Sequence, residues 1–254
     1  MPLSRPIKMS SKPIWGPAMA EPRMMLDVKN LEAWYGESHI LHGVDFNVHE
    51  GEVVTLLGRN GAGKTTTLKS IIGMIGKRRG SVAFEGQETI ALTSDKIARL
   101  GIAFCPEERG IFASLDVMEN LLLPPKVREG GLSVEQIFTL FPNLAERRKS
   151  QGTKLSGGEQ QMLAIGRILR TGARLLMLDE PTEGLAPVII EQIGHTIQKL
   201  KQQGFTILLV EQNFRFASTV ADRFYVMEHG RVIDSFANRD LAANMSKLHE
   251  YLGV

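Results

Sequence analysis

One segment constrains the fold of this chain more than any other: the glycine-rich run GRNGAGKT at residues 58–65. Residues 52–57 before it are typical of a strand, and a helix is expected after it, over about residues 63–73. In such a strand–loop–helix unit, the glycines let backbone N–H groups turn toward a phosphate, and the helix dipole adds positive charge. Lys64 would contact the phosphates, and the Thr65 hydroxyl would be a ligand of Mg²⁺. The segment therefore predicts an α/β domain that binds a nucleoside triphosphate. The residues expected around the phosphates are Gly58, Asn60, Gly61, Gly63, Lys64, Thr65 and Thr66.

A second segment, RLLMLDE at residues 174–180, supplies two carboxylates. Its apolar run suits a parallel strand that is covered on both faces, and open α/β sheets bind ligands at the carboxyl ends of their strands. Asp179 would hold Mg²⁺ directly or through water, and Glu180 would polarise the attacking water as general base. An acidic residue before Pro181 is also a common way to begin a helix. Beside a phosphate loop, the catalytic interpretation is favoured.

A third segment, LSGGEQQ at residues 155–161, lies between these two. Ser156, Gly157 and Gly158 precede an expected helix over residues 159–169, whose N-terminus would form a second anion site. The run resembles the signature of ATP-binding cassette (ABC) ATPases. In that family the signature faces the γ-phosphate held by the other cassette of a head-to-tail dimer. The resemblance therefore implies hydrolysis of ATP with Mg²⁺, and pairing of this chain with itself or with a sister cassette.

The same resemblance implies the architecture. We expect an α/β ABC ATPase core, with a mixed or parallel sheet and flanking helices, over residues 25–236. Strand and helix patterns alternate around the two nucleotide motifs, whereas the mainly helical patterning of about residues 107–171 corresponds to the inserted α-helical subdomain of the family. Residues 237–254 would form a short C-terminal helical cap. The proline-rich residues 1–24 are expected to be disordered or extended.

Composition limits the partners of the chain. The net charge of +2 over 254 residues gives no electrostatic reason to expect nucleic-acid binding. The single cysteine, Cys105, excludes an internal disulfide. No apolar run approaches the roughly 18 to 20 residues that span a bilayer, so membrane contact would come through a partner. His39 and His42 lie in a strand-and-turn region, where that spacing is not expected to place them on one face, and no metal site is expected there.

Three further positions are assigned by the family resemblance. Tyr35 occupies the position where ABC proteins stack an aromatic ring on adenine. Glu107 stands where the family usually has a glutamine that contacts Mg²⁺, and Gln212 stands at the switch position, usually histidine. Gln212 can still donate a hydrogen bond to the γ-phosphate but carries no charge. Glu107 can ligate Mg²⁺ but adds negative charge near the phosphates.

Together these departures resemble one subfamily. The sequences PEER at 106–109, EGLAP at 183–187 and VEQN at 210–213 are similar to ATP-binding subunits of branched-chain amino acid importers, LivF type. The similarity runs from about residue 25 to residue 254. It implies uptake of leucine, isoleucine and valine, with a second cassette, two transmembrane permease subunits and, indirectly, a periplasmic binding protein. The chain would lie peripherally on the cytoplasmic face of the inner membrane. Cassettes for urea, amides or other amino acids, and less so for lipopolysaccharide export, are the alternatives.

Overall fold

The computed structural model describes residues 23–253 of the chain. Most of the N-terminal segment expected over residues 1–24 therefore lies outside the described residues. The strands are β1 (Met24–Tyr35), β2 (Ser38–His49), β3 (Val53–Leu57), β4 (Lys77–Phe84), β5 (Gln87–Glu88), β6 (Ile102–Cys105), β7 (Leu175–Asp179), β8 (Thr206–Glu211), β9 (Arg223–Glu228) and β10 (Arg231–Ala237). The α-helices are α1 (Lys64–Ile71), α2 (Ser94–Arg99), α3 (Val117–Leu122), α4 (Val134–Leu140), α5 (Pro142–Glu146), α6 (Gly157–Leu169), α7 (Pro187–Gln202), α8 (Phe214–Val220) and α9 (Leu241–Leu252). Two short 3₁₀ helices cover Gly152–Lys154 and Asn238–Asp240.

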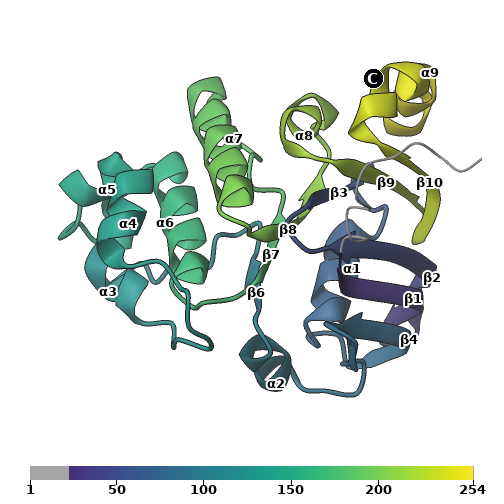
Figure 1. The fold of residues 1–254 in the computed structure, drawn as a ribbon, viewed down its shortest axis with the longest axis horizontal. Helices are drawn as coiled ribbons and strands as arrows, with labels where there is room; N and C mark the ends of the chain where they lie inside the picture. The colour runs from purple at the N-terminus through teal and green to yellow at the C-terminus, as the bar shows by residue number, and fades with distance from the viewer. Residues whose placement is uncertain (1–22, 254) are drawn as a thin grey trace, which may run out of the picture.

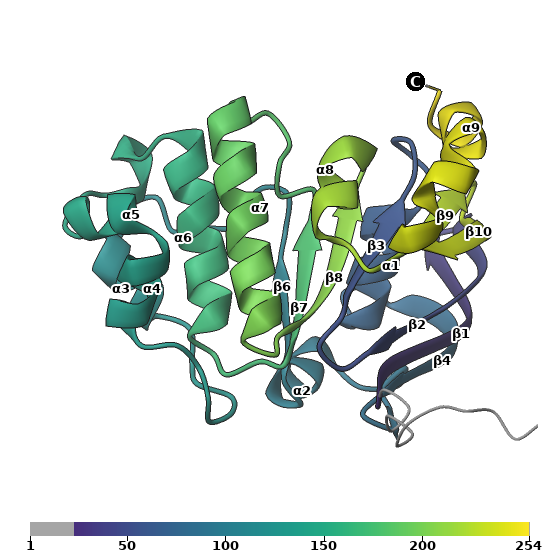
Figure 2. The ribbon, with the colours of Figure 1, turned by 45° about the horizontal axis from the view of Figure 1, so that its top comes forward.

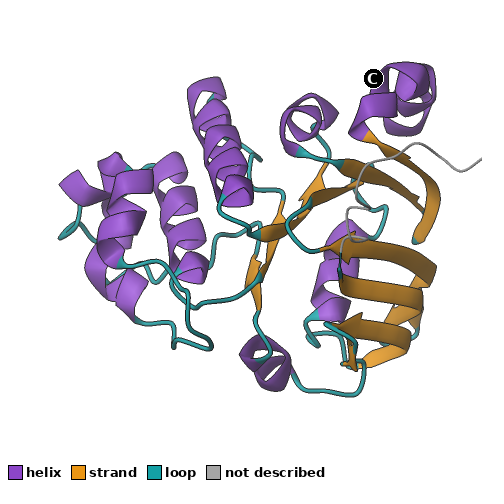
Figure 3. Ribbon diagram, viewed as in Figure 1, coloured by secondary structure: helices purple, strands orange, loops and turns teal. Residues whose placement is uncertain are grey.

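The core is a sheet in the order β10-β9-β3-β8-β7-β6, in which β10 alone is antiparallel to its neighbour (Figure 3). Every residue of β3, β7 and β8 is buried, as expected for strands covered on both faces. Alternate side chains of β3 enter different cores. Val53 and Leu57 pack with α6, α7 and α8, whereas Val54 and Leu56 pack with α1 and the second sheet. This arrangement confirms the predicted α/β fold class.

The second sheet is antiparallel, in the order β2-β1-β4-β5, and covers α1 on the side away from the core sheet (Figure 1). On its β1–β2 ladder, Trp34 pairs with His39 although Ala33 pairs with Leu41, so the register shifts there. Such a bulge changes the face on which later side chains point. The rings of His39 and His42 consequently meet edge to face, with centroids 4.1 Å apart. The sequence expectation that they would not share a face was wrong for this reason.

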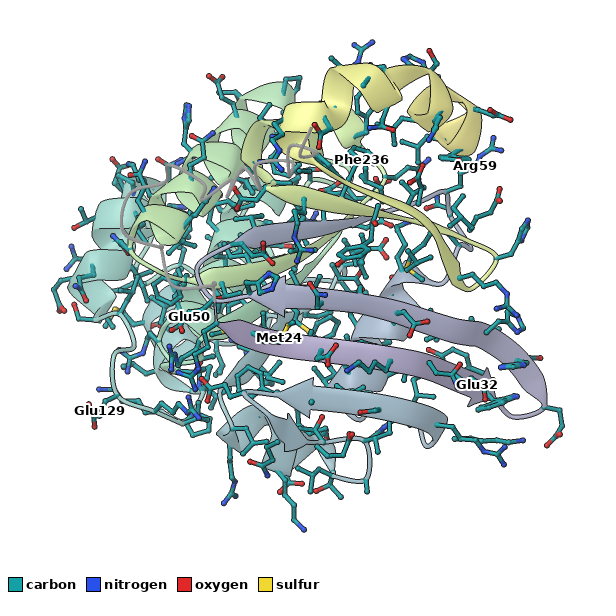
Figure 4. All side chains as sticks on the ribbon, turned by 45° about the vertical axis from the view of Figure 1, so that its right-hand side comes forward. Met24, Glu32, Glu50, Arg59, Glu129 and Phe236 are labelled. Atoms are coloured by element: carbon teal, nitrogen blue, oxygen red, sulfur yellow. The ribbon has the colours of Figure 1, made fainter. Side chains whose placement is uncertain are left out.

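The helices α3 to α6 form a group at one end of the molecule, and α6 lies beside α7 in both ribbon views (Figures 1 and 2). Their apolar residues, such as Leu121, Ile137 and Leu144, belong to the same buried cluster as the α6–α8 face of the sheet. At the other end, α9 lies near the phosphate loop. Figure 4 labels Arg59, whose guanidinium lies 2.5 Å from where a Cβ on Gly253 would be. Among the described residues, no helix is both long and apolar enough to cross a membrane.

Candidate nucleotide-binding site

A cavity of about 430 Å³ opens where β3 and β7 end and α1 begins. Carboxyl ends of parallel strands and the positive end of a helix converge there, which favours an anionic ligand. The structure thus brings together residues that are far apart in the sequence. The lining residues are Tyr35, Ile40, Asn60, Gly61, Gly63, Lys64, Thr65, Thr66, Glu107, Glu180 and Glu183.

The phosphate loop holds its shape through close backbone packing. A Cβ on Gly58 would lie 2.5 Å from the carbonyl oxygen of Met227, so only glycine fits there. Gly63 has a φ of 103°, in the left-handed region that favours glycine, and directly precedes α1. Inside the loop, the buried Lys64 donates to the carbonyl oxygens of Gly58 at 2.8 Å and Arg59 at 3.2 Å. These two hydrogen bonds hold the Lys64 side chain within the phosphate loop, where it lines the cavity.

Lys64 also forms an ion pair with Glu180, with 3.0 Å between Nζ and Oε1. Both side chains are largely buried, so water screens this pair weakly. Glu180 has a φ of 44°, unusual for a residue other than glycine, and its N–H donates to the carbonyl oxygen of Val210 at 2.9 Å. The strained backbone directs the Glu180 carboxylate across the cavity to the phosphate loop.

Asp179 lies below Thr65 and is 1% exposed. Its Oδ1 accepts a hydrogen bond from the Thr65 hydroxyl at 3.0 Å, whereas its Oδ2 is buried without any hydrogen-bond partner. Burial raises the pKa of Asp179 to about 6, and the charges of Glu180 and Glu107 add to the increase. The hydrogen bond from Thr65 acts in the opposite direction and lowers the pKa. A carboxylate oxygen that is buried and unpaired beside a hydroxyl suits a cation.

Tyr35 and Glu107 lie on the rim of the cavity. Tyr35 is 49% exposed and lines the cavity, as a residue that contacts a bound ligand would. Glu107 is exposed and belongs to the loop after β6. Gln212, in contrast, is an exposed residue in the loop after β8 and does not line the cavity.

The signature residues also lie outside the cavity. Ser156 is the N-cap of α6: its Oγ accepts from the N–H of Glu159 at 3.3 Å, and its own N–H donates to the Glu159 carboxylate at 2.7 Å. A Cβ on Gly158 would lie 2.9 Å from Ile189 of α7, so glycine is needed for α6 to pack there. Ser156 remains exposed at the N-terminus of the helix. Within one chain, the signature and the phosphate loop do not form a common site.

Two groups of contacts were missed by sequence reasoning. The carboxylate of Glu211 accepts a hydrogen bond from the Thr182 hydroxyl at 2.8 Å, and neither residue lines the cavity. Arg109, in the loop that carries Glu107, donates to the side chain of Gln160 on α6 at 3.2 Å. A carboxylate at the end of an otherwise apolar strand was the available signal for Glu211. Nothing in the sequence indicates which side chain Arg109 contacts.

Similar proteins give the family. The sequence profile of the ABC transporter family matches residues 41–183. The high-affinity branched-chain amino acid transport ATP-binding protein BraG of Pseudomonas aeruginosa is 42% identical, over 90% of this chain and 100% of that protein. A probable branched-chain amino acid transport ATP-binding protein LivF of Archaeoglobus fulgidus is 39% identical, over 82% of this chain and 90% of that protein. The lipopolysaccharide export system ATP-binding protein LptB of Escherichia coli is 32% identical, over 90% of this chain and 97% of that protein.

Solved structures agree with the sequence relatives. An ATP-binding subunit of an ABC transporter superimposes with a TM-score of 0.75 at 30% identity, over 91% of this chain and 100% of that one. A bacterial ABC transporter cassette solved as a dimer gives a TM-score of 0.74 at 26% identity, over 85% of this chain and 99% of that one. The predicted resemblance is confirmed, and this chain belongs to the ABC transporter family as an ATP-binding subunit.

Proposed function

We propose that this chain hydrolyses ATP to energise the uptake of branched-chain amino acids. The observation that carries the cargo assignment is the 42% identity to BraG over the whole length of that protein. The ATPase chemistry is supported separately by the cavity, in which Lys64, Thr65 and Glu180 converge, with Asp179 directly beneath Thr65. We further propose that the chain acts at the cytoplasmic face of the inner membrane, bound peripherally to permease subunits.

ATP would bind with its phosphates in the loop and its adenine ring against Tyr35. Lys64 and the N–H groups of residues 60–66 would contact the β- and γ-phosphates. Because Lys64 now pairs with Glu180, the phosphates and this carboxylate would compete for the same ammonium group. Phosphate binding to Lys64 would therefore release Glu180 to act on water.

The oxygen atoms near the Thr65 hydroxyl fit a bound Mg²⁺. The unpaired Oδ2 of Asp179, the Thr65 hydroxyl and the Glu107 carboxylate are the oxygen ligands available. No cluster of three acidic, histidine or cysteine side chains within residues 23–253 could hold a metal unaided. This is the usual pattern for Mg²⁺, which takes one or two carboxylates and completes its shell with substrate phosphates and water. Bound there, Mg²⁺ would neutralise charge on the β- and γ-phosphates.

Hydrolysis would depend on Glu180 and Gln212. Glu180 would accept the proton of the attacking water as general base. Gln212 would donate a hydrogen bond from its side-chain amide to the γ-phosphate, without the charge that a histidine could add. Its exposed position, outside the cavity of the single chain, is suited to contact when the site closes.

The active site would be completed by a second cassette. The exposed N-terminus of α6, with Ser156, Gly157 and Gly158, would meet the γ-phosphate bound by the partner cassette. We propose that this chain forms a head-to-tail heterodimer with a sister cassette. If the sister chain has histidine at the switch position, the two composite sites would be unequal, because only one of them would have Gln212. A periplasmic binding protein would act indirectly, through the permeases.

An apolar groove offers a contact for a permease helix. This groove has a volume of about 430 Å³ and lies between α2, β6 and the loop before residue 128. Phe104, three residues before Glu107, is part of its wall. A permease helix seated there would sense movement of the Glu107 loop. The apolar residues that line it are Ile72, Met74, Ala98, Ile102, Ala103, Phe104, Pro125, Val127 and Ile168.

Transport assays test the cargo. Cells that lack this chain should lose high-affinity uptake of radiolabelled leucine, which the wild-type chain restores and Glu180→Gln does not. Normal leucine uptake together with impaired uptake of urea, an amide or another amino acid would replace the cargo and leave the ATPase proposal intact. The similarity to LptB supports a second candidate, an export cassette. That candidate predicts a defect in lipopolysaccharide export with leucine uptake unchanged.

A further inference from the structure

A buried carboxylate with no proposed role lies at the end of β8. Glu211 is 2% exposed, and all the other residues of β8 are buried too. Burial raises the pKa of Glu211 to about 7, and the charge of Glu180 adds to the increase. Hydrogen bonds from Thr182 and Asn213 act in the opposite direction and lower the pKa. An apolar side chain would avoid the cost of burying this group. Packing alone therefore does not account for a glutamate here.

The contacts of Glu211 join two loops. Its Oε1 accepts a hydrogen bond from the hydroxyl of Thr182, which is 5% exposed, at 2.8 Å. Its Oε2 accepts from the N–H of Asn213 at 3.4 Å. Thr182 lies two residues after Glu180, and Asn213 lies directly after Gln212. One side chain thus bridges the segment that follows β7 and the segment that follows β8.

Gln212 lies between Glu211 and Asn213, and hydrogen bonds hold the side chains of both neighbours. On one side, Glu211 is held by Thr182. On the other side, Asn213 is the N-cap of α8, where its Oδ1 accepts from the N–H of Phe216 at 3.1 Å. The exposed Gln212 side chain therefore projects from a backbone that is anchored before and after it.

The two segments are also joined at a second point. The N–H of Glu180 donates to the carbonyl oxygen of Val210 at 2.9 Å, directly before Glu211. This bond lies at the end of the β7–β8 ladder, in which Asp179 pairs with Val210. The Thr182–Glu211 bond adds a side-chain link between the two segments beyond the end of that ladder.

We propose that Glu211 is a positioning residue, which through Thr182 holds the segment carrying Gln212 in register with the segment carrying Glu180. Glu211 itself does not line the cavity. The inference rests on the proposed roles of Glu180 and Gln212 in hydrolysis. It assigns a function to a buried pair that the phosphate loop, the Mg²⁺ ligands and the signature leave unexplained.

A pair of substitutions at Thr182 tests the hydrogen bond. Thr182→Val keeps the shape and removes the hydroxyl, whereas Thr182→Ser keeps the hydroxyl. The kcat for ATP hydrolysis should fall roughly five- to tenfold in Thr182→Val, the factor that corresponds to losing one positioning hydrogen bond. The KM for ATP should stay within about twofold, because the phosphate contacts are intact, and Thr182→Ser should keep most of the activity. Measurements use the full chain purified with the subunits that it binds.

A matched control separates positioning from stability. Thr89 is also buried, and its hydroxyl donates to the carbonyl oxygen of Val82 in β4 at 2.9 Å. Thr89→Val should lower the Tm about as much as Thr182→Val without the same loss of kcat. Equal kcat losses in the two variants would show that Thr182 acts only through stability and would overturn the proposal.

The double variant tests whether both residues act through one contact. In Glu211→Gln, the amide can accept from Thr182 only by turning its NH₂ toward the N–H of Asn213, so one of its two bonds is lost. We expect kcat to fall here too, and Thr182→Val/Glu211→Gln to be no slower than the slower single variant. Fully additive losses, or wild-type kcat in both single variants, would overturn the positioning role.

Gln212→Ala distinguishes the positioning role of Glu211 from the proposed switch role of Gln212, on which it rests. If Gln212→Ala loses hydrolysis while Thr182→Val and Glu211→Gln keep it, only the positioning role fails. If Gln212→Ala hydrolyses ATP at the wild-type rate, the switch role fails, and the positioning role fails with it. Loss of kcat in all three variants, with the KM for ATP preserved, supports both.

Discussion

At the scale of single residues, the ion pair between Lys64 and Glu180 would link ATP binding to the proposed role of Glu180 in hydrolysis. Glu180→Gln removes the proposed base and also removes the charge that competes with phosphate for Lys64. Hydrolysis should fall on the order of 10²-fold or more, while the affinity for ATP is kept or increased. Turnover within about threefold of wild type would exclude Glu180 as the base. Lys64→Ala, by comparison, should weaken ATP binding itself, and equilibrium binding of a fluorescent ATP analogue distinguishes the two variants.

Two buried acids should make the stability of the nucleotide-free chain depend on pH. Burial raises the pKa of Asp179 to about 6 and that of Glu211 to about 7. A raised acid pKa means that the folded state binds more protons between the unfolded and folded values, so stability falls as pH rises through that window. The free energy of unfolding should therefore decrease from about pH 4 to about pH 7, by at most about 1.4 kcal/mol per pH unit for each group.

Denaturant titrations at several pH values measure this slope. Glu211→Gln should flatten the part of the curve between about pH 5 and pH 7, because the group that titrates there is gone. Mg²⁺ should flatten the part that Asp179 contributes, since a bound cation keeps this carboxylate ionised. A stability that rises steadily with pH over the same window would contradict the assignment of both groups.

At the scale of elements, α6 presents its N-terminus to the outside of the molecule. Its exposed Ser156 is the N-cap, and its glycines pack the helix against α7. In the proposed dimer, Ser156→Arg would place bulk and charge at the position expected for the γ-phosphate held by the partner cassette. ATP should still bind the phosphate loop of the same chain, but ATP-dependent dimer closure and hydrolysis should fail. Size-exclusion chromatography with and without ATP, beside equilibrium binding, measures both; an equal loss of ATP affinity in the monomer would contradict action across the interface.

The same elements show what the sequence could and could not predict. The strand–loop–helix unit and the DE pair were predictable because phosphate and Mg²⁺ require particular residues at fixed local spacing. The Thr182–Glu211 and Arg109–Gln160 bonds join residues 29 and 51 positions apart, and only packing of the β7, β8 and α6 termini brings them together. The contact of His39 with His42 depends on a bulge, which strict alternation along a strand does not anticipate.

At the scale of the whole molecule, the phosphate-loop cavity and the apolar groove are separate but share one segment, residues 104–109, which comprises the end of β6 and the loop after it. Phe104 lies in the wall of the groove, Glu107 lies on the rim of the cavity, and Arg109 contacts Gln160 on α6. Movement of this loop would therefore affect the groove, the nucleotide site and the signature helix together. Such a contiguous set of contacts would provide a physical route by which closure of the cassettes could reach the proposed membrane partner.

Substitution of Met74 tests this connection. Met74 lines the groove and is 59% exposed, so Met74→Glu should fold normally while placing a charge on an apolar contact surface. We expect the variant to bind ATP like wild type, to co-purify with less permease, and to lose leucine uptake in cells. Ile233→Glu is the matched control, because Ile233 is an exposed apolar residue of β10 outside the groove and its substitution should leave permease binding unchanged. If both variants bind permease equally well, the groove is not the coupling surface, whereas a selective loss in Met74→Glu identifies it as the face through which ATP-driven closure reaches the permease.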